Sequence, residues 1–173
     1  MNKHTAIVII ASFIIAGPFV FAAWNIYGIQ QIQFVGTQEK KFNYFDMIND
    51  GEINVCNPNP FYVVFDKMDI LMIFEQRDKG RFSIQGTTLS PSSVTTLEGK
   101  FRSDTFQESQ YLSLHFDGMF SGSAPIRIDP SKFAIATETH TSIIGIIPYS
   151  ITQQYSGFDF WNMMNDKGGQ LSC

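Results

Sequence analysis

Residues 62–85 read YVVFDKMDILMIFEQRDKGRFSIQ, and this stretch decides the fold class of the chain. Its β-prone runs, rich in β-branched and aromatic side chains, are residues 62–64, 68–75 and 81–85. The Arg-Asp-Lys-Gly of residues 77–80 is typical of a turn between strands. The stretch therefore predicts a β-hairpin that turns at residues 77–80, with Phe82 and Ile84 on its buried face.

The same pattern recurs on both sides of this hairpin, as short runs of alternating polarity between turn residues. These further runs are residues 29–35, 52–56, 94–101, 111–120, 126–128, 133–137 and 142–154. Residues 44–48 and 104–110 are candidates for short helical turns. Roughly eight strands at this spacing predict an all-β domain over residues 29–155, built as an antiparallel β-sandwich.

The N-terminal run from Ala6 to Tyr27 is apolar apart from Ser12 and Asn25. As a helix of about 22 residues it would span roughly 33 Å, enough for the hydrocarbon core of a bilayer. Its anchor residues are Ile7, Ile10, Phe13, Ile14, Gly17, Pro18, Phe21, Trp24 and Tyr27. We expect Pro18 to bend the span. We also expect the rings of Trp24 and Tyr27, at the outer end of the span, to lie at the interface between membrane and water. Residues 1–28 therefore predict one transmembrane anchor.

Lys3 precedes the apolar run, so the positive-inside tendency predicts a cytoplasmic N-terminus and an extracytoplasmic domain in a single-pass protein of the cell membrane. Lys40 and Lys41, on the far side, weaken this orientation. The alternative is a cleaved signal peptide, because Val20-Phe21-Ala22 is an acceptable small-residue cleavage site. Either interpretation exports the rest of the chain.

The net charge and the cysteine count limit which partners and which covalent cross-links the chain can have. The formal net charge is −4 and no basic cluster is present, which disfavours nucleic acid as a partner. Cys56 and Cys173 are the only cysteines. They would pair in an oxidising compartment or remain as two free thiols, and the sequence favours neither state.

The most specific motif is Asn57-Pro58-Asn59-Pro60-Phe61, set between two apolar runs. Neither proline can donate to a β-ladder, so the motif belongs at a strand end, a bulge or an unpaired edge, where it would form a rigid bend. With its flanking strands it resembles the late-embryogenesis-abundant group-two family, also called the water-stress and hypersensitive-response (WHy) domain. The resemblance covers about residues 34–155. It implies an immunoglobulin-like or fibronectin-III-like sandwich, often held by one N-terminal transmembrane helix, with no known catalytic residues.

Catalytic chemistry finds little support. His115 and Asp117 would share one strand face, where an Asp can orient a His, but a surface contact is the commoner explanation. No nucleophile elbow, zinc-protease helix or phosphate-binding loop occurs. A copper site from the Met163-Met164 pair with His140 or His115 is a weak alternative. We therefore assign no catalytic, cofactor-binding or metal-binding residue, and no cofactor.

The tail, residues 156–173, gathers large apolar side chains into a short segment. They are Phe158, Phe160, Trp161, Met163 and Met164. The tail either packs back across the domain or contacts a partner or the membrane surface, since exposed aromatic clusters mark contact sites.

Together these features predict a non-catalytic, membrane-anchored binding or structural module. Its expected partners are the lipid bilayer, through the helix, and other membrane protein subunits. An accessory subunit of a larger membrane complex is an alternative, because Ala11, Ser12, Ala16 and Gly17 offer a close-packing patch. Stress (desiccation) protection follows from the resemblance alone, and a membrane-tethered enzyme or metal carrier is the remaining class.

We expect the anchor to be retained in the mature protein, because its apolar run exceeds the length of a signal-peptide core. Intact-mass measurement of the purified protein tests this. A chain that begins at Ala23 would contradict the anchor, whereas a chain that keeps residues 1–22 agrees with it.

Overall fold

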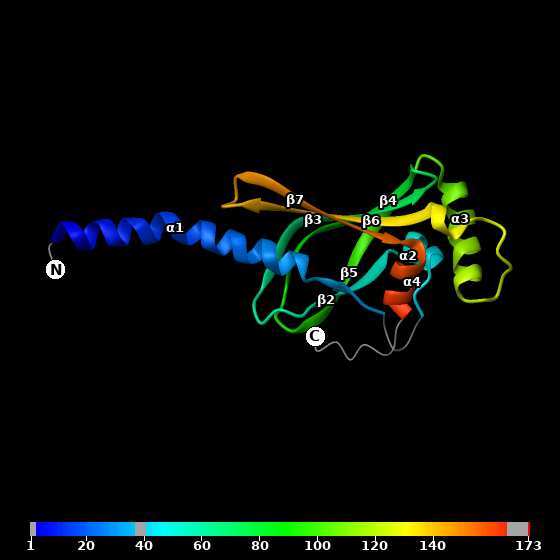
Figure 1. Cartoon of the computed structure of the whole chain (residues 1–173), viewed down its shortest axis with the longest axis horizontal. Coiled ribbons are helices and arrows are strands. Elements are labelled where there is room, and N and C mark those ends of the chain that lie inside the picture. Colours follow the sequence, from blue (N-terminus) through cyan, green and yellow to red (C-terminus); the bar gives the residue numbers. More distant parts are fainter. Residues whose placement is uncertain (1–2, 37–40, 166–172) are drawn as a thin grey trace.

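The computed structural model describes residues 3–36, 41–165 and 173. A long N-terminal helix projects from a curled antiparallel sheet, and three shorter helices gather at the end of the sheet away from it (Figure 1). One N-terminal apolar helix followed by a β-rich domain was the coarse prediction, and it is confirmed. The helices are α1 (Lys3–Gln30), α2 (Tyr44–Asp50), α3 (Phe106–Phe120) and α4 (Gly157–Asn165), with a 3-10 turn, η1 (Pro130–Lys132).

The strands form one seven-stranded ladder, ordered β1-β2-β5-β4-β3-β6-β7, and every described pair is antiparallel. They are β1 (Gln33–Phe34), β2 (Glu52–Asn57), β3 (Val63–Phe74), β4 (Arg77–Leu89), β5 (Ser93–Arg102), β6 (Phe133–Ile143) and β7 (Ile147–Ser156). The long strands β3 and β4 occupy the middle of this order. The hairpin predicted from residues 62–85 is therefore the centre of the sheet.

The turn of this hairpin lies earlier than predicted. Phe74 pairs with Arg77, so Glu75 and Gln76 form the turn, with φ of 51° and 64°. Two consecutive positive φ angles match the two-residue turn whose twist suits a hairpin. Gly80 instead lies inside β4, where the ring of Phe101 occupies the space that a side chain would need. The sequence pattern predicted a turn at Gly80, because the Phe101 ring that requires a glycine there belongs to another strand, β5.

Several other element predictions were wrong. Residues 111–120 are helical and belong to α3, because Ser109, Leu112, Ser113 and Phe116 share one buried face at helical spacing. Residues 126–128 form no strand. Residues 142–154 contain a turn that separates β6 from β7, and most of residues 29–35 continues α1 or links it to the short β1. The runs at residues 52–56, 94–101 and 133–137 are strands, as predicted. Residues 44–48 are helical, also as predicted, and belong to α2.

An aromatic core fills the space between the sheet and the short helices. Phe116 of α3 stacks on Phe133 of β6 with ring centroids 4.2 Å apart and planes at 7°. Tyr44 of α2 is fully buried, packs edge-on against Phe133 and donates its hydroxyl to the Gly157 carbonyl over 2.6 Å. These contacts join α2, α3, β6 and α4 into one unit. Aromatic pairs of this kind stabilise beyond their buried area.

Cys56 and Cys173 form a disulfide. Cys56 is fully buried in β2, and the bond joins it to the last residue of the chain. The two sulfurs close a loop with a sequence separation of 117 residues. Of the two states that the sequence left open, the structure has the paired one.

Replacing Cys173 with serine should lower the free energy of unfolding by about 2 to 5 kcal/mol, because a cross-link over so long a loop restricts the unfolded chain. Urea denaturation of the full chain in detergent measures this. A reducing agent should reproduce the loss in the wild type and add nothing in the variant. Equal stability of oxidised and reduced wild type would contradict the prediction.

Candidate functional site at the junction of helix and sheet

The first part of α1 lies outside the folded domain. The segment Ile7–Gln30 of α1 is long and apolar enough to cross a membrane, and only 6% of the most apolar window in this segment is buried. The helix continues through Pro18. Most predicted anchor side chains are exposed by half or more: Ile7, Ile10, Phe13, Ile14, Phe21, Trp24 and Tyr27. Gly17 and Pro18 are exposed as well. A core helix would be buried, so this apolar surface needs another partner.

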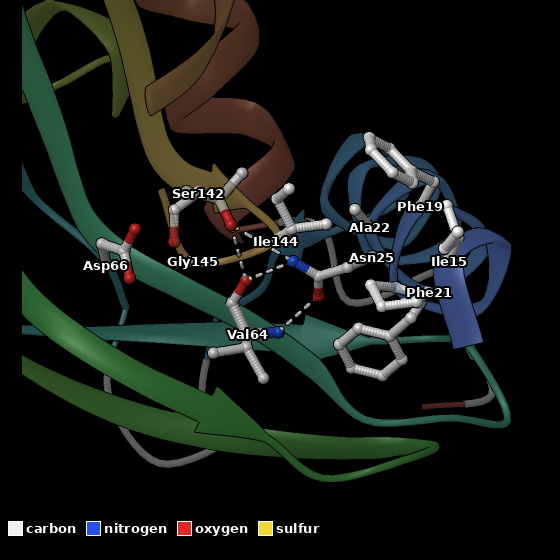
Figure 2. A pocket seen from close by; sticks show the side chains of 12 residues that line it. Ile15, Phe19, Phe21, Ala22, Asn25, Val64, Asp66, Ser142, Ile144 and Gly145 are labelled. Carbon is white, nitrogen blue, oxygen red and sulfur yellow. Dashed lines mark hydrogen bonds between the residues drawn. The ribbon is translucent and has the colours of Figure 1, made fainter. Parts of the chain in front are cut away.

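The last turns of α1 dock on the sheet through Asn25, which is 7% exposed (Figure 2). Its Nδ2 donates to the Val64 carbonyl over 2.7 Å, and its Oδ1 accepts from the Val64 amide over 2.8 Å. The pairing of β3 with β6 begins only at Lys67 and His140, so Val64 has no strand neighbour on that side. Thr141 lies 3.3 Å from the same Nδ2. The Asn25 amide therefore replaces a missing strand residue.

The Asn-Pro-Asn-Pro-Phe motif forms the second dock between α1 and the sheet. Asn57 is fully buried. Its Nδ2 donates to the carbonyl of Phe61, in the connection from β2 to β3, and to the carbonyls of Leu89 and Ser90, where β4 ends. Asn59 donates to the carbonyl of Gly28 in α1 over 3.2 Å and to Asn57 Oδ1 over 2.9 Å. Pro58 and Pro60 occupy the connection, where no ladder bond is required of them. The motif is thus a rigid bend that also holds the helix.

Next to Asn25 lies an open pocket of about 590 Å³ between α1 and the β6–β7 hairpin (Figure 2). One wall is apolar and comes from the helix, with Ile15, Phe19 and Ala22. The opposite wall is the hairpin turn at Ile144 and Gly145. The polar residues of the lining are Asn25, Asp66, Thr141 and Ser142. All of these except Asn25 belong to the domain, so the helical wall is apolar apart from Asn25.

A separate charged cluster lies on β3, β4 and β6. The Asp69 carboxylate is fully buried and accepts from Lys67 Nζ over 2.8 Å and Ser83 Oγ over 2.6 Å, with Arg81 Nη1 at 3.3 Å. Burial by itself raises the pKa of Asp69, but these hydrogen bonds and the two cations outweigh it and hold the pKa below its ordinary value. The carboxylate is thus satisfied as an anion inside the sheet.

Asp69, Glu138 and His140 are close enough for their ligand atoms to hold one metal ion. His140 Nε2 lies 3.7 Å from Asp69 and 3.8 Å from Glu138. The same Asp69 oxygen, however, already bonds Lys67 and Arg81. A divalent cation would have to displace or approach those two positive charges. The cluster is better explained as an ion-pair network.

The strand face that His115 and Asp117 were expected to share does not exist, because these residues lie on a helix, where positions two apart do not face each other. His115 stacks on Tyr111. Asp117 accepts from the backbone amides of Tyr44 and Phe45, at 2.8 and 2.9 Å, and so caps the start of α2. Burial raises the pKa of Asp117 to about 6 in spite of these bonds, and the nearby Asp46 adds to the rise.

The aromatic tail forms α4 in the part of the tail that the structure describes, and it packs back on the domain. Phe160 and Met164 are buried in the core, Trp161 and Met163 are half-buried against it, and Phe158 is 45% exposed. The suggested copper ligands are therefore divided among different elements: His115 in α3, His140 in β6 and Met164 inside the core. Among the five apolar side chains named in the tail, Phe158 is the most exposed.

The sequence reasoning missed the structural role of Asn25 and the Asp69 cluster. Asn25 carried a usable signal, since it is the one amide in the apolar run from Ala6 to Tyr27. Asp69 carried none, because its partners Ser83 and Arg81 become neighbours only through strand pairing.

Comparison with known proteins adds little. No family model and no curated protein matches the chain. A solved structure described as a protein from Archaeoglobus fulgidus matches at a TM-score of 0.31 and 9% sequence identity, over 73% of this chain and 93% of that one. A likeness at this level assigns neither a fold type nor a function.

Replacing Asn25 with alanine should lower the free energy of unfolding by about 2 kcal/mol, because the Val64 amide then loses its partner and the Val64 carbonyl keeps only the 3.4 Å bond from Thr141 Oγ1. Hydrogen exchange at the Val64 amide should accelerate at the same time. Ser12→Ala is the matched control, since Ser12 only bonds the Val8 carbonyl on the exposed part of the helix. Unchanged exchange at Val64 would show that Asn25 does not hold the junction.

The raised pKa of Asp117 predicts a pH-dependent stability difference. The folded state keeps the Asp117 proton up to about pH 6, whereas the unfolded chain releases it near the ordinary value of 3.8. The wild type should therefore lose stability relative to Asp117→Asn as the pH rises from about 4 to 6, by up to about 3 kcal/mol. Urea unfolding of both proteins across this range measures the difference. A difference that is constant with pH would contradict the raised pKa.

Proposed function

We propose that this chain is a membrane-anchored, extracytoplasmic and non-catalytic module that binds or supports another component at the outer face of the membrane. The observation that carries the proposal is the hydrogen-bonded junction of α1 with the sheet, made by Asn25 and Asn59. A helix that served only to keep the domain near the membrane would need no such junction. Two docks instead hold the sheet at a fixed angle to α1, so the same faces always meet the bilayer and its neighbours.

The disulfide supports the extracytoplasmic side of this proposal. Disulfides persist in oxidising compartments and are rare in the cytosol. The Cys56–Cys173 bond closes the domain, and Lys3 before the apolar run favours a cytoplasmic N-terminus. The two arguments are independent, and both support an extracytoplasmic domain.

The family assignment is part of the proposal as well. The Asn-Pro-Asn-Pro-Phe crossover between β2 and β3, inside an antiparallel domain behind one apolar helix, is what the WHy resemblance implies. We propose on that basis an immunoglobulin-like or fibronectin-III-like type for the domain. Stress protection of the membrane surface rests on this resemblance alone and is the weaker function.

An accessory subunit of a membrane complex is the second candidate. Gly17 has no neighbouring atom within 4 Å of where a side chain would begin, so α1 keeps an open small-residue surface. Small residues let transmembrane helices approach closely. A tethered enzyme or metal carrier has less support, because His115, Asp117 and Met164 each have a separate packing or capping role.

The topology is tested with two fusions at the C-terminus of the full chain. An alkaline phosphatase fusion should be active and a green fluorescent protein fusion dark, since each reporter works on one side of the membrane. Both fusions should remain in the membrane after carbonate extraction. A fluorescent, phosphatase-inactive pair would overturn the extracytoplasmic placement, and extraction by carbonate would overturn the anchor.

Purification in mild detergent separates the two candidate functions. An accessory subunit should migrate on a native gel with stoichiometric partners, and Gly17→Leu should release them while leaving the disulfide and the fold intact. The matched control is Ile10→Leu, on the same helix. A lone monomer in both the wild type and the variant would remove the subunit hypothesis.

A further inference from the structure

The β6–β7 hairpin ends in an exposed apolar turn. Ile144, Ile146, Ile147 and Tyr149 are 36%, 79%, 49% and 39% exposed. The segment from 142 to 149 reads SIIGIIPY and carries no charge. The turn is built at Ile144 and Gly145, whose φ angles are 52° and 73°. Exposing several isoleucine side chains to water at one tip costs free energy, and an exposed apolar patch usually marks a contact surface.

The hairpin tip lies beside the exposed part of α1. Figure 1 shows the β6–β7 hairpin extending past the other strands toward the N-terminal end of the helix. The pocket described above has Ile15 and Phe19 on its helical side and Ile144 and Gly145 on its hairpin side (Figure 2). Asn25, where the domain begins to hold α1, is about 15 Å farther along the helix axis than Ile15. The tip therefore lies level with residues that are part of the apolar span.

We propose that the turn of the β6–β7 hairpin, residues 143–149, inserts into the outer leaflet of the same bilayer that α1 crosses. The inference rests on the proposed membrane-spanning role of α1, because the depth of the tip is set by its neighbours Ile15 and Phe19. A lipid surface is the occupant that the geometry favours, since the apolar tip continues the apolar surface of the helix. The domain then holds the membrane at two points instead of one.

The hairpin suits this position. Ser142 pairs with Pro148 and Ile143 with Ile147, and the Ile146 amide donates to the Ile143 carbonyl over 3.2 Å, so part of the backbone of the tip is already bonded. Unpaired backbone groups are costly in hydrocarbon, which favours such a closed turn. Tyr149 lies toward the base of the tip, and tyrosine favours the interface between hydrocarbon and water. Asp66 and Ser142 line the polar side of the pocket and would lie at the level of the headgroups.

A tryptophan scan in lipid vesicles tests the insertion. The full chain, with Trp24→Phe and Trp161→Phe, is reconstituted into phosphatidylcholine vesicles that contain brominated acyl chains, which quench nearby indoles. Ile146→Trp reports on the tip. Ile126→Trp is the matched control, because Ile126 is 73% exposed in the connection between α3 and η1, at the other end of the domain. Phe13→Trp reports on the span itself.

Insertion predicts that bromolipid quenches Ile146→Trp at least threefold more strongly than Ile126→Trp, with emission shifted to the blue. Equal quenching of these two positions, with Phe13→Trp strongly quenched, overturns the inserted tip and leaves the anchor in place. Weak quenching at Phe13→Trp overturns the anchor and the inserted tip together. A blue-shifted but unquenched tip shows that protein and not lipid covers it, which also overturns the proposal. Retention of the disulfide in each variant shows that it is folded.

Discussion

The two hydrogen bonds between the Asn25 amide and the Val64 backbone are the constraint on which the arrangement of this protein depends. β3 lies in the middle of the strand order, yet its first residues extend beyond the part that β6 covers. Backbone groups at such a place need partners, and a strand neighbour is missing. The Asn25 side chain of α1 supplies both hydrogen bonds. The same two bonds therefore satisfy the end of β3 and attach the helix to the sheet.

The second dock, from Asn59 to Gly28, makes this connection resistant to rotation. One attachment point would leave α1 free to swing, whereas two points three residues apart on the helix, at Asn25 and Gly28, restrict its direction. Both docks are polar, and breaking the first leaves the Val64 amide without its Asn25 partner. Gly28 contributes by its small size, since a side chain there would collide with Val63 and Phe61. The fixed direction is what brings the β6–β7 hairpin alongside the apolar helix.

The opposite end of the domain is held by different forces. Phe116, Phe133 and Tyr44 join three elements through ring contacts, and Asp117 caps α2 at the cost of burying a carboxylate. Apolar packing thus closes the end away from α1, whereas buried amides organise the end next to it. The disulfide lies on the side of these amides, because Cys56 pairs with Gln33 just beyond α1 and directly precedes Asn57.

The sequence by itself determined the apolar helix, the β-rich class and the rigid bend at Asn57–Phe61, because these depend on composition, alternation and the missing donors of proline. It also placed β2 and β5 correctly. It misassigned residues 111–120, where alternating and helical spacing coincide over a short run, and it placed the hairpin turn at a glycine that is required by packing. Only the tertiary structure decided the pairing of Cys56 with Cys173, the contacts of Asp69 with Arg81 and Ser83, and the role of Asn25. Each of these joins residues far apart in the chain, and local pattern carries no information about which distant backbone group will lack a partner.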